Sequence, residues 1–486
     1  MSSISFFCDL AEATTPLPHF WKHTVGSDHA PMALRADWQE QLRLCHDELG
    51  FQYVRFHGLL SDDMGTLVRQ NNKLLYSFFN IDQIFDFLLS IGMKPFVELS
   101  FMPEVLASGT KTVFNYKANV TPPRDYKQWA SLINRLVSHW VQRYGMKEVR
   151  QWFFEVWNEP NLKSFWSGTQ RDYFRLYRYT AEAIKQVDPE LRVGGPASAK
   201  SEWIEKFVDF CERNKLSADF ISTHYYPSDG FENEPETEVQ LYLSQRGIMR
   251  EVAQNVRRQA RGRPVYYTEW NSSSDQRDPL HDESYAAAFA VATIMEATGS
   301  VEGYSFWTFS DIFAENYFPS VPYHGGFGLL NLQGIPKPTY RAFQLLHDLG
   351  TRQSLVDGLH DTVDCSVIQQ NRSVTVLLTN HATPGHSIET EQIEIRLDNA
   401  PEPVTAHIQR IDAEHANPKK LWEDMGQPEY LNPKDVERLR KASLLAKQRQ
   451  SLSYRVGAIF LKTSLPPHSV AAITIEFVPG ESKVSQ

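Results

Sequence analysis

The feature that most constrains the fold is an alternation, repeated eight times up to about residue 345, between a short apolar run and a longer segment of helical periodicity. The apolar runs are nearly continuous, which is typical of parallel strands buried on both faces. They cover residues 21–25, 53–57, 95–100, 152–158, 192–196, 220–225, 265–270 and 303–309. This pattern predicts an α/β fold in which a parallel sheet closes into a (β/α)8 TIM barrel.

The segments between the runs carry helix signals. Residues 37–49 end before Gly50, a suitable left-handed C′ residue, and residues 125–144 end before Gly145. A doubly wound open sheet is the alternative, but it would bind its ligand at a topological switch point. No GxGxxG motif follows a strand, and we expect the glycine-rich stretch 325–328 to be a loop rather than a phosphate-binding turn.

The pattern changes after Gly350, where apolar and polar residues alternate as in half-buried antiparallel strands. The alternating runs cover residues 365–368, 374–378, 393–397, 404–410, 456–461 and 470–475. They predict an antiparallel β-sandwich domain over residues 349–486, after a barrel domain over residues 16–348. A charged helix near residues 433–448 is expected to interrupt the sandwich. Within residues 1–15, the run 4–8 is expected to add a strand to it.

Composition narrows the classes of partner. The formal net charge of −10 disfavours nucleic-acid binding, which requires basic patches. No segment approaches about 18 uninterrupted apolar residues, and the N-terminus lacks the basic region of a signal peptide. We therefore expect no membrane association and a cytoplasmic location. The four cysteines are widely spaced without a CxxC motif, which predicts buried free thiols.

Two glutamates follow buried strands at positions that face the active site of a barrel. Side chains at the carboxyl ends of barrel strands surround that site, and Glu159 and Glu269 close the fourth and seventh runs. Burying a carboxylate is costly unless the group has a role. Paired carboxylates are what cleavage of a glycosidic bond requires, one to protonate the leaving oxygen and one to attack or stabilise the anomeric carbon. An ion pair sealing the barrel mouth is the structural alternative for either residue.

Other polar residues of the strands are expected to support this pair. Arg55 and His224 would hold Glu269 in its ionised form by charge and hydrogen bonding. Glu155 and Glu98 have the parity of residues that point into the barrel interior, so we expect them to be structural. The histidines show no HExxH or similar spacing, so no metal ion and no organic cofactor is expected.

The sequence resembles glycoside hydrolase family 39, which contains bacterial β-xylosidases and α-L-iduronidases, and it is most similar to the β-xylosidases. The matching stretches are 55–65 (RFHGLLSDDMG), 101–109 (FMPEVLASG), 119–126 (NVTPPRDY), 154–162 (FEVWNEPNL), 268–271 (TEWN), 307–311 (WTFSD), 324–329 (HGGFGL) and 335–339 (IPKPT). The resemblance implies that Glu159 is the general acid/base and Glu269 the nucleophile. It also implies sugar contacts by His57, Asn158, Phe165, His224, Tyr226, Trp307 and Glu315.

One departure concerns Ala314-Glu315, where similar proteins often carry two acidic residues; the loss of one carboxylate would loosen selection among pentoses or admit a larger sugar. The expected function is a retaining glycoside hydrolase that releases terminal xylose from β-xylosides or xylo-oligosaccharides by double displacement. One alternative keeps this machinery but acts on another sugar, as an α-L-arabinosidase, a β-glucosidase, a β-galactosidase or an endo-acting hydrolase. Another is a non-catalytic carbohydrate-binding protein. The expected partner is a small oligosaccharide or glycoside, and homo-oligomerisation stays open.

Overall fold

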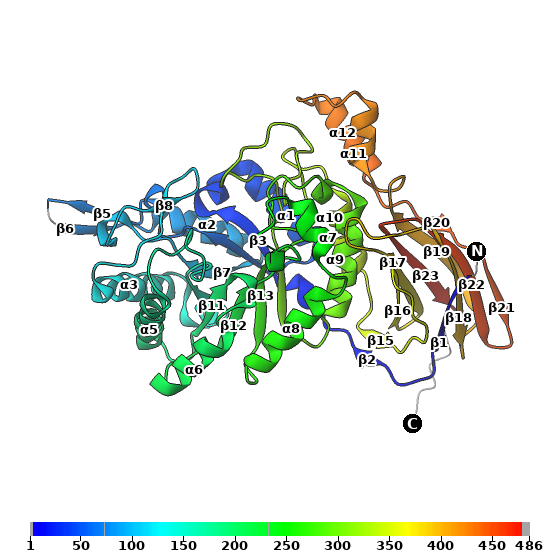
Figure 1. Ribbon diagram of the computed structural model, residues 1–486, viewed down its shortest axis with the longest axis horizontal. Coiled ribbons are helices and arrows are strands. Elements are labelled where there is room, and N and C mark those ends of the chain that lie inside the picture. The colour runs from blue at the N-terminus through cyan, green and yellow to red at the C-terminus, as the bar shows by residue number, and fades with distance from the viewer. Residues whose placement is uncertain (1–2, 72, 232, 479–486) are drawn as a thin grey trace.

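The computed structural model describes residues 3–71, 73–231 and 233–478, which form a barrel with a β-sandwich beside it (Figure 1). The described residues include a closed barrel of eight parallel strands. These are β3 (Thr24–His29), β4 (Tyr53–His57), β7 (Lys94–Leu99), β10 (Phe153–Val156), β11 (Arg192–Ser198), β12 (Phe220–His224), β13 (Val265–Trp270) and β14 (Gly303–Phe306). The predicted barrel is thus confirmed.

The first predicted strand was misplaced. Residues 21–25 were expected to form it, whereas Phe20–Lys22 is a 3-10 helix and β3 begins only at Thr24. Phe20 and Trp21 are apolar because both side chains are buried in the core, not because they lie in a strand.

Helices surround the barrel in Figure 1. They are α1 (Ala36–Leu49), α2 (Phe79–Ser90), α3 (Tyr126–Tyr144), α4 (Met146–Val149), α5 (Gln170–Val187), α6 (Ile204–Asn214), α7 (Thr237–Leu243), α8 (Ile248–Gln259), α9 (Ser284–Glu296) and α10 (Pro338–His347). Helix α1 ends at Gly50, which has the left-handed φ of 76° expected of a C′ glycine. Two short hairpins extend loops of the barrel: β5 (Leu67–Gln70) with β6 (Lys73–Tyr76), and β8 (Thr112–Val113) with β9 (Ala118–Asn119).

Aromatic rings fill the amino-terminal end of the barrel. Phe96 and Phe153 stack with ring centroids 5.0 Å apart, and Tyr266 lies 5.0 Å from Phe153. Phe220 completes this cluster and contacts both phenylalanines edge-on. Because bulky rings close this end, a substrate has to bind at the opposite end, where the carboxyl ends of the strands lie.

The second domain is a sandwich of two sheets, as predicted. One sheet contains, in order, β2 (Thr15–Pro16), β15 (Arg352–Ser354), β16 (Val363–Gln370), β17 (Ser373–Asn380), β23 (Ser469–Phe477), β19 (Pro403–Ile411) and β20 (Gln448–Arg449). The other contains β1 (Ile4–Asp9), β18 (Glu391–Asp398), β22 (Ala458–Leu465) and β21 (Leu452–Arg455). Side chains of both sheets form one core, including Phe6, Val376, Ile395 and Ile473.

Several details of the sandwich differ from the prediction. The run 4–8 does add a strand, since β1 pairs in parallel with β18. The predicted helix 433–448 is shorter, because α12 (Pro433–Ala442) ends before Ser443, and a helix was missed at α11 (Pro418–Asp424). The run 456–461 was placed too early, because Val456 and Gly457 have positive φ and turn the chain between β21 and β22. The domain boundary near residue 349 remains a prediction.

The sandwich contacts the barrel through α9. Tyr285 of α9 lies 5.1 Å, between ring centroids, from both His381 and His468 of the sandwich domain. Burial lowers the pKa of His381 well below its ordinary value, so this contact is between uncharged rings. The cysteines are free, and all but the half-buried Cys365 are buried.

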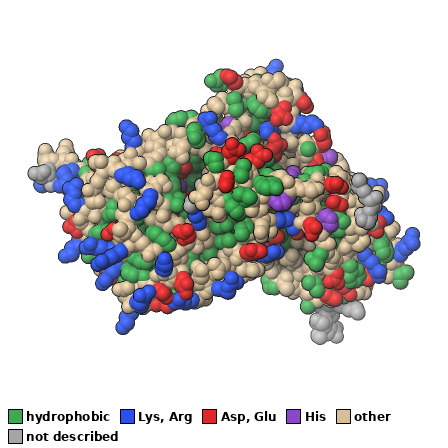
Figure 2. Space-filling model, viewed as in Figure 1, with side chains coloured by type: hydrophobic (Ala, Val, Ile, Leu, Met, Phe, Trp, Pro, Cys, Tyr) green, Lys and Arg blue, Asp and Glu red, His purple; other side chains and the backbone are tan. Residues whose placement is uncertain are grey.

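Charge is unevenly distributed over the surface. Lys and Arg side chains gather at the end of the molecule that carries α3, α5 and α6 (Figure 2), including the exposed Arg171, Arg175 and Arg178 of α5. The expected lack of nucleic-acid binding therefore stays a prediction. None of the helices in the described ranges has the length and apolar character needed to span a bilayer.

Candidate active site

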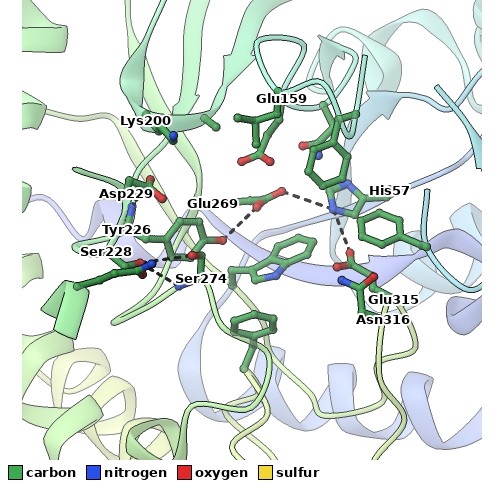
Figure 3. Close-up of a pocket in the computed structure, with 18 residues that line it drawn as sticks. His57, Glu159, Lys200, Tyr226, Ser228, Asp229, Glu269, Ser274, Glu315 and Asn316 are labelled. Atoms are coloured by element: carbon green, nitrogen blue, oxygen red, sulfur yellow. Dashed lines mark hydrogen bonds and ion pairs between the residues drawn. The ribbon is translucent and has the colours of Figure 1, made fainter. Parts of the chain in front are cut away.

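A cavity of about 310 Å³ opens at the carboxyl ends of the barrel strands (Figure 3). It brings together most of the residues singled out from the sequence: His57, Asn158, Glu159, Phe165, Tyr226, Glu269, Trp307 and Glu315. Sequence reasoning did not find the other lining residues, which are Phe114, Leu162, Ala199, Lys200, Ser228, Asp229, Gln240, Ser274, Asn316 and Phe327.

The two glutamates face each other in the cavity. Glu159 follows β10 and Glu269 lies in β13, and an oxygen of one carboxyl group lies within 4.8 Å of an oxygen of the other. Their residues are only 8% and 5% exposed. Glu159 has a positive φ of 44°, and its backbone N–H donates to Ala197 O at 2.8 Å, a bond that supports this strained conformation.

Arg55 organises the base of the site. Its guanidinium is fully buried and donates from Nη1 to Glu269 Oε1 at 2.8 Å and from Nε to Glu155 Oε2 at 2.5 Å. Nη2 lies 2.8 Å from Glu98 Oε2 and donates to Asn158 Oδ1 at 2.9 Å. The planar guanidinium thus fixes several acceptors at once, as only arginine can. Glu155 and Glu98 do point into the interior, but they also hold the group that positions Glu269.

The same contacts orient the amide of Asn158. Because its Oδ1 accepts from Arg55, its Nδ2 is left to donate into the cavity that Asn158 lines. This orientation suits a contact with a sugar hydroxyl.

Electrostatics separates the roles of the two glutamates. Burial, followed by repulsion from Glu269, raises the pKa of Glu159 well above its ordinary value. Burial also raises the pKa of Glu269, but the electrostatic interactions with Arg55 and His57 oppose this. Arg55 thus favours the ionised form of Glu269, whereas burial and repulsion favour the protonated form of Glu159.

His224 does not line the cavity, contrary to the expectation of a sugar contact. The ring is fully buried, with Nδ1 at 3.0 Å from Glu159 Oε1 and Nε2 at 3.0 Å from Thr268 Oγ1. Both ring nitrogens are therefore occupied by protein atoms. Burial also lowers the pKa of His224 well below its ordinary value, so it does not hold Glu269 ionised by charge as expected. The sequence could not show that this ring lies beneath the carboxyl groups.

Tyr226 supplies the hydrogen bond that His224 does not. Its hydroxyl donates to Glu269 Oε2 at 3.1 Å, so both oxygens of Glu269 have a donor. The backbone N–H of Tyr226 donates to Asp229 Oδ2 at 2.8 Å, and burial raises the pKa of Asp229 to about 7.

Glu315 lines the cavity next to His57. His57 Nε2 lies 3.4 Å from Glu315 Oε1, and its Nδ1 donates to Glu98 Oε2 at 2.7 Å. The backbone of the Glu315 loop is fixed, because Asn115 N donates to Glu315 O at 2.8 Å and Ala314 N to Asp28 Oδ2 at 2.7 Å. Burial and the nearby Asp28 raise the pKa of Glu315 well above its ordinary value.

A buried lysine, Lys337, supports the cavity wall near Trp307 and Phe327. Lys337 Nζ lies 2.6 Å from Asp282 Oδ1 and 2.7 Å from Asp311 Oδ2, and all these side chains are buried. Asp311 Oδ1 accepts from Gly328 N at 2.7 Å, and a Cβ on Gly326 would lie 2.3 Å from the same oxygen. The glycine-rich stretch is thus a loop, as predicted, packed around an ion cluster that fixes Phe327 in the cavity wall.

The residues that sequence reasoning missed lie mostly in loops. Lys200 follows β11 in a segment where Ala197, Lys200, Ser201 and Trp203 all have positive φ. Such loops carry no periodic pattern, so only the spatial arrangement shows which side chains reach the cavity.

The carboxyl pair also bears on metal binding. In the part of the chain that the structure describes, Glu159, His224 and Glu269 form the one group whose donor atoms lie close enough together to hold a metal ion. The set fits a proton better than a metal, because the raised pKa of Glu159 opposes the deprotonation that a metal ligand needs.

Comparisons with known proteins identify the family of the chain. The family model for glycosyl hydrolases family 39 matches residues 7–455. A β-xylosidase of Caldicellulosiruptor saccharolyticus is 51% identical over 94% of this chain and 95% of its own length. A β-xylosidase of Geobacillus stearothermophilus is 36% identical over 95% and 94%. The crystal structure of a GH39 enzyme from Xanthomonas axonopodis pv. citri superimposes with a TM-score of 0.86 at 32% identity, covering 98% of each chain.

Replacement of Arg55 tests its role as the organiser of the buried charges. Arg55→Met leaves Glu98, Glu155 and Glu269 without their cation, and we expect the free energy of unfolding to fall by about 3–5 kcal/mol. Urea unfolding followed by tryptophan fluorescence measures this. Arg55→Lys is the matched control, because it keeps the charge and should lose less. An Arg55→Met variant as stable as the wild type would contradict the assignment.

Proposed function

This chain belongs to glycosyl hydrolase family 39, and we propose that it is a retaining, exo-acting β-xylosidase that releases terminal xylose from β-xylosides and xylo-oligosaccharides. The two relatives named as β-xylosidases, at 51% and 36% identity over nearly the whole chain, support this substrate class. The observation that carries the mechanism is the pair Glu159 and Glu269, with oxygens within 4.8 Å of each other in one cavity.

The spacing of these carboxyl groups favours retention of configuration. Inverting enzymes separate theirs by about 6.5–9.5 Å to admit a water molecule, whereas retaining enzymes need about 5–5.5 Å. In the proposed first step, Glu159 donates its proton to the leaving oxygen while Glu269 attacks the anomeric carbon. A covalent glycosyl-enzyme forms on Glu269. Glu159, now ionised, then takes a proton from water, whose oxygen attacks the same carbon and releases the sugar.

Neighbouring side chains would assist at the transition state. The Asn158 amide, turned into the cavity by Arg55, is placed to donate to the sugar 2-hydroxyl. Such a contact strengthens as the oxocarbenium character develops and contributes several kcal/mol, roughly, to catalysis. We assign His57, Phe165, Trp307 and Glu315 to the walls around the sugar, because all four line the cavity.

The shape of the cavity supports exo action. At about 310 Å³ it lies at the lower end of the roughly 300–1,000 Å³ range of ligand pockets. Bulky side chains, including Phe114, Trp307 and Phe327, line it and limit the space for more than one sugar. A terminal sugar fits such a site better than the middle of a polymer chain does.

One observation favours uronides, such as α-L-iduronides, as a second substrate class. Lys200 lines the cavity beside Asp229, and a cation in this place suits a sugar that carries a carboxylate. An aryl α-L-iduronide therefore belongs beside the aryl β-xyloside, α-L-arabinoside, β-glucoside and β-galactoside in a kinetic panel. We expect kcat/KM to be highest for the β-xyloside.

The stereochemistry of the product tests the mechanism. With an aryl β-xyloside as substrate, ¹H NMR at early times should show β-xylose first, with α-xylose appearing only by mutarotation. Retention is expected because the close carboxyl groups leave no place for water opposite the leaving group. If α-xylose appears first, the proposed roles of Glu159 and Glu269 are wrong.

Removal of the general acid tests the second role. Glu159→Ala should lower kcat/KM by about 10²–10⁴-fold for a xyloside with a poor leaving group, but far less for a dinitrophenyl xyloside. The acid must be protonated, so its raised pKa keeps wild-type activity up to a higher pH than an ordinary glutamate would. The alkaline limb of the pH profile should therefore be lost in Glu159→Ala. The exposed Glu190→Ala is a matched control that should leave the profile unchanged.

A further inference from the structure

We propose that Glu155 and Thr268, which lie outside the cavity lining, fix the tautomer of His224 and thereby keep the transferable proton on Glu159. This inference rests on the proposed function, in which Glu159 is the acid. It makes Glu155, Thr268 and His224 positioning residues.

A continuous chain of hydrogen bonds carries the proposal. Arg55 Nε donates to Glu155 Oε2 at 2.5 Å, and Thr268 Oγ1 donates to Glu155 Oε1 at 2.7 Å. Thr268 Oγ1 also lies 3.0 Å from His224 Nε2, and His224 Nδ1 lies 3.0 Å from Glu159 Oε1. Arg55, Glu155 and His224 are fully buried and Thr268 is 1% exposed, so water does not compete for these bonds.

The available protons fix which group donates in each of these hydrogen bonds. Glu155 is ion-paired with Arg55, so its other oxygen accepts the single hydroxyl proton of Thr268. The Thr268 oxygen can then only accept, and the donor to it is His224 Nε2–H. A neutral histidine has one N–H, so Nδ1 is an acceptor.

The group facing His224 Nδ1 must therefore donate, and Glu159 can donate only when protonated. Burial raises the pKa of Glu159 and lowers that of His224, so each group favours the protonation state that the chain requires. The hydrogen bond from Glu159 to His224 Nδ1 favours protonated Glu159 further, because it exists only when Glu159 carries the proton.

The arrangement also serves both halves of the reaction. When Glu159 gives its proton to the leaving group, its carboxylate oxygen is left facing the lone pair of Nδ1. This contact is repulsive, and it favours recovery of a proton from the attacking water in the second step. The proton that is transferred is the one on Glu159 alone, because His224 keeps its Nε2–H bonded to Thr268 throughout.

Glu155→Gln should reverse the direction of the hydrogen bonds between residue 155 and Glu159. Arg55 Nε still requires an acceptor, so the amide oxygen of the new side chain faces Arg55 and its NH₂ donates to Thr268. The Thr268 hydroxyl then donates to His224 Nε2, and Nδ1–H donates to Glu159, which stabilises the ionised form. We expect the alkaline limb of kcat/KM to move about one pH unit lower. Near neutral pH, activity should fall about tenfold on xylobiose and little on a dinitrophenyl xyloside.

Thr268 variants separate this effect from simple loss of structure. Thr268→Val removes the hydroxyl with little change in volume and should shift the alkaline limb in the same direction, by less. Thr268→Ser restores the hydroxyl and should return the limb towards the wild-type position. If neither Glu155→Gln nor Thr268→Val moves the limb, the proposal is overturned.

The tautomer itself gives a readout that needs no substrate. Long-range ¹H–¹⁵N NMR of the histidine-labelled wild type should show His224 with the proton on Nε2, assigned by loss of its signals in His224→Gln. Glu155→Gln should show the proton on Nδ1. If the wild type carries the proton on Nδ1 of His224, the proposed hydrogen-bond arrangement is wrong even though the enzyme is active. Failure of the proposed function would instead appear as an absence of glycoside turnover.

Discussion

The site depends on one buried guanidinium. Arg55 lies in the barrel without solvent contact and meets Glu98, Glu155, Glu269 and the amide oxygen of Asn158. Without that cation, several carboxylates would have to be buried together, which is far more costly than any hydrogen bond could offset. The charge of Arg55 stabilises an ionised Glu269 although this residue is buried, and the planar guanidinium fixes the orientation of that carboxylate and of the Asn158 amide.

Proton placement follows from this asymmetry. Glu269 receives donors on both oxygens, from Arg55 and Tyr226, whereas Glu159 faces the acceptor nitrogen of His224 in the arrangement that we propose. In the proposed mechanism, their different neighbours give the two glutamates opposite tasks. The aromatic layer at the other end of the barrel and the Lys337 ion cluster under Phe327 support the site by filling and fixing the frame around it.

The sequence predicts the frame well because burial on both faces leaves a clear apolar pattern. The pattern fails at the first strand, where Phe20 and Trp21 are apolar for another reason. Their positions at strand ends and the family resemblance both predict Glu159 and Glu269 as residues of the site. The sequence does not show how deeply a side chain is buried. His224 was therefore expected in the cavity, although it lies beneath it. Loop residues such as Lys200 and Asp229 have no signal in one sequence, because their positions depend on irregular backbone.

In the proposed mechanism, the carboxylate held by Arg55 becomes covalently bonded to the sugar. A 2-deoxy-2-fluoro-xylosyl fluoride forms the glycosyl-enzyme but slows its hydrolysis, so the adduct can be digested and located by tandem mass spectrometry. We expect one label per chain, on Glu269 in the peptide that contains β13. A label on Glu159 or Glu315, or rapid turnover without any adduct, would contradict it.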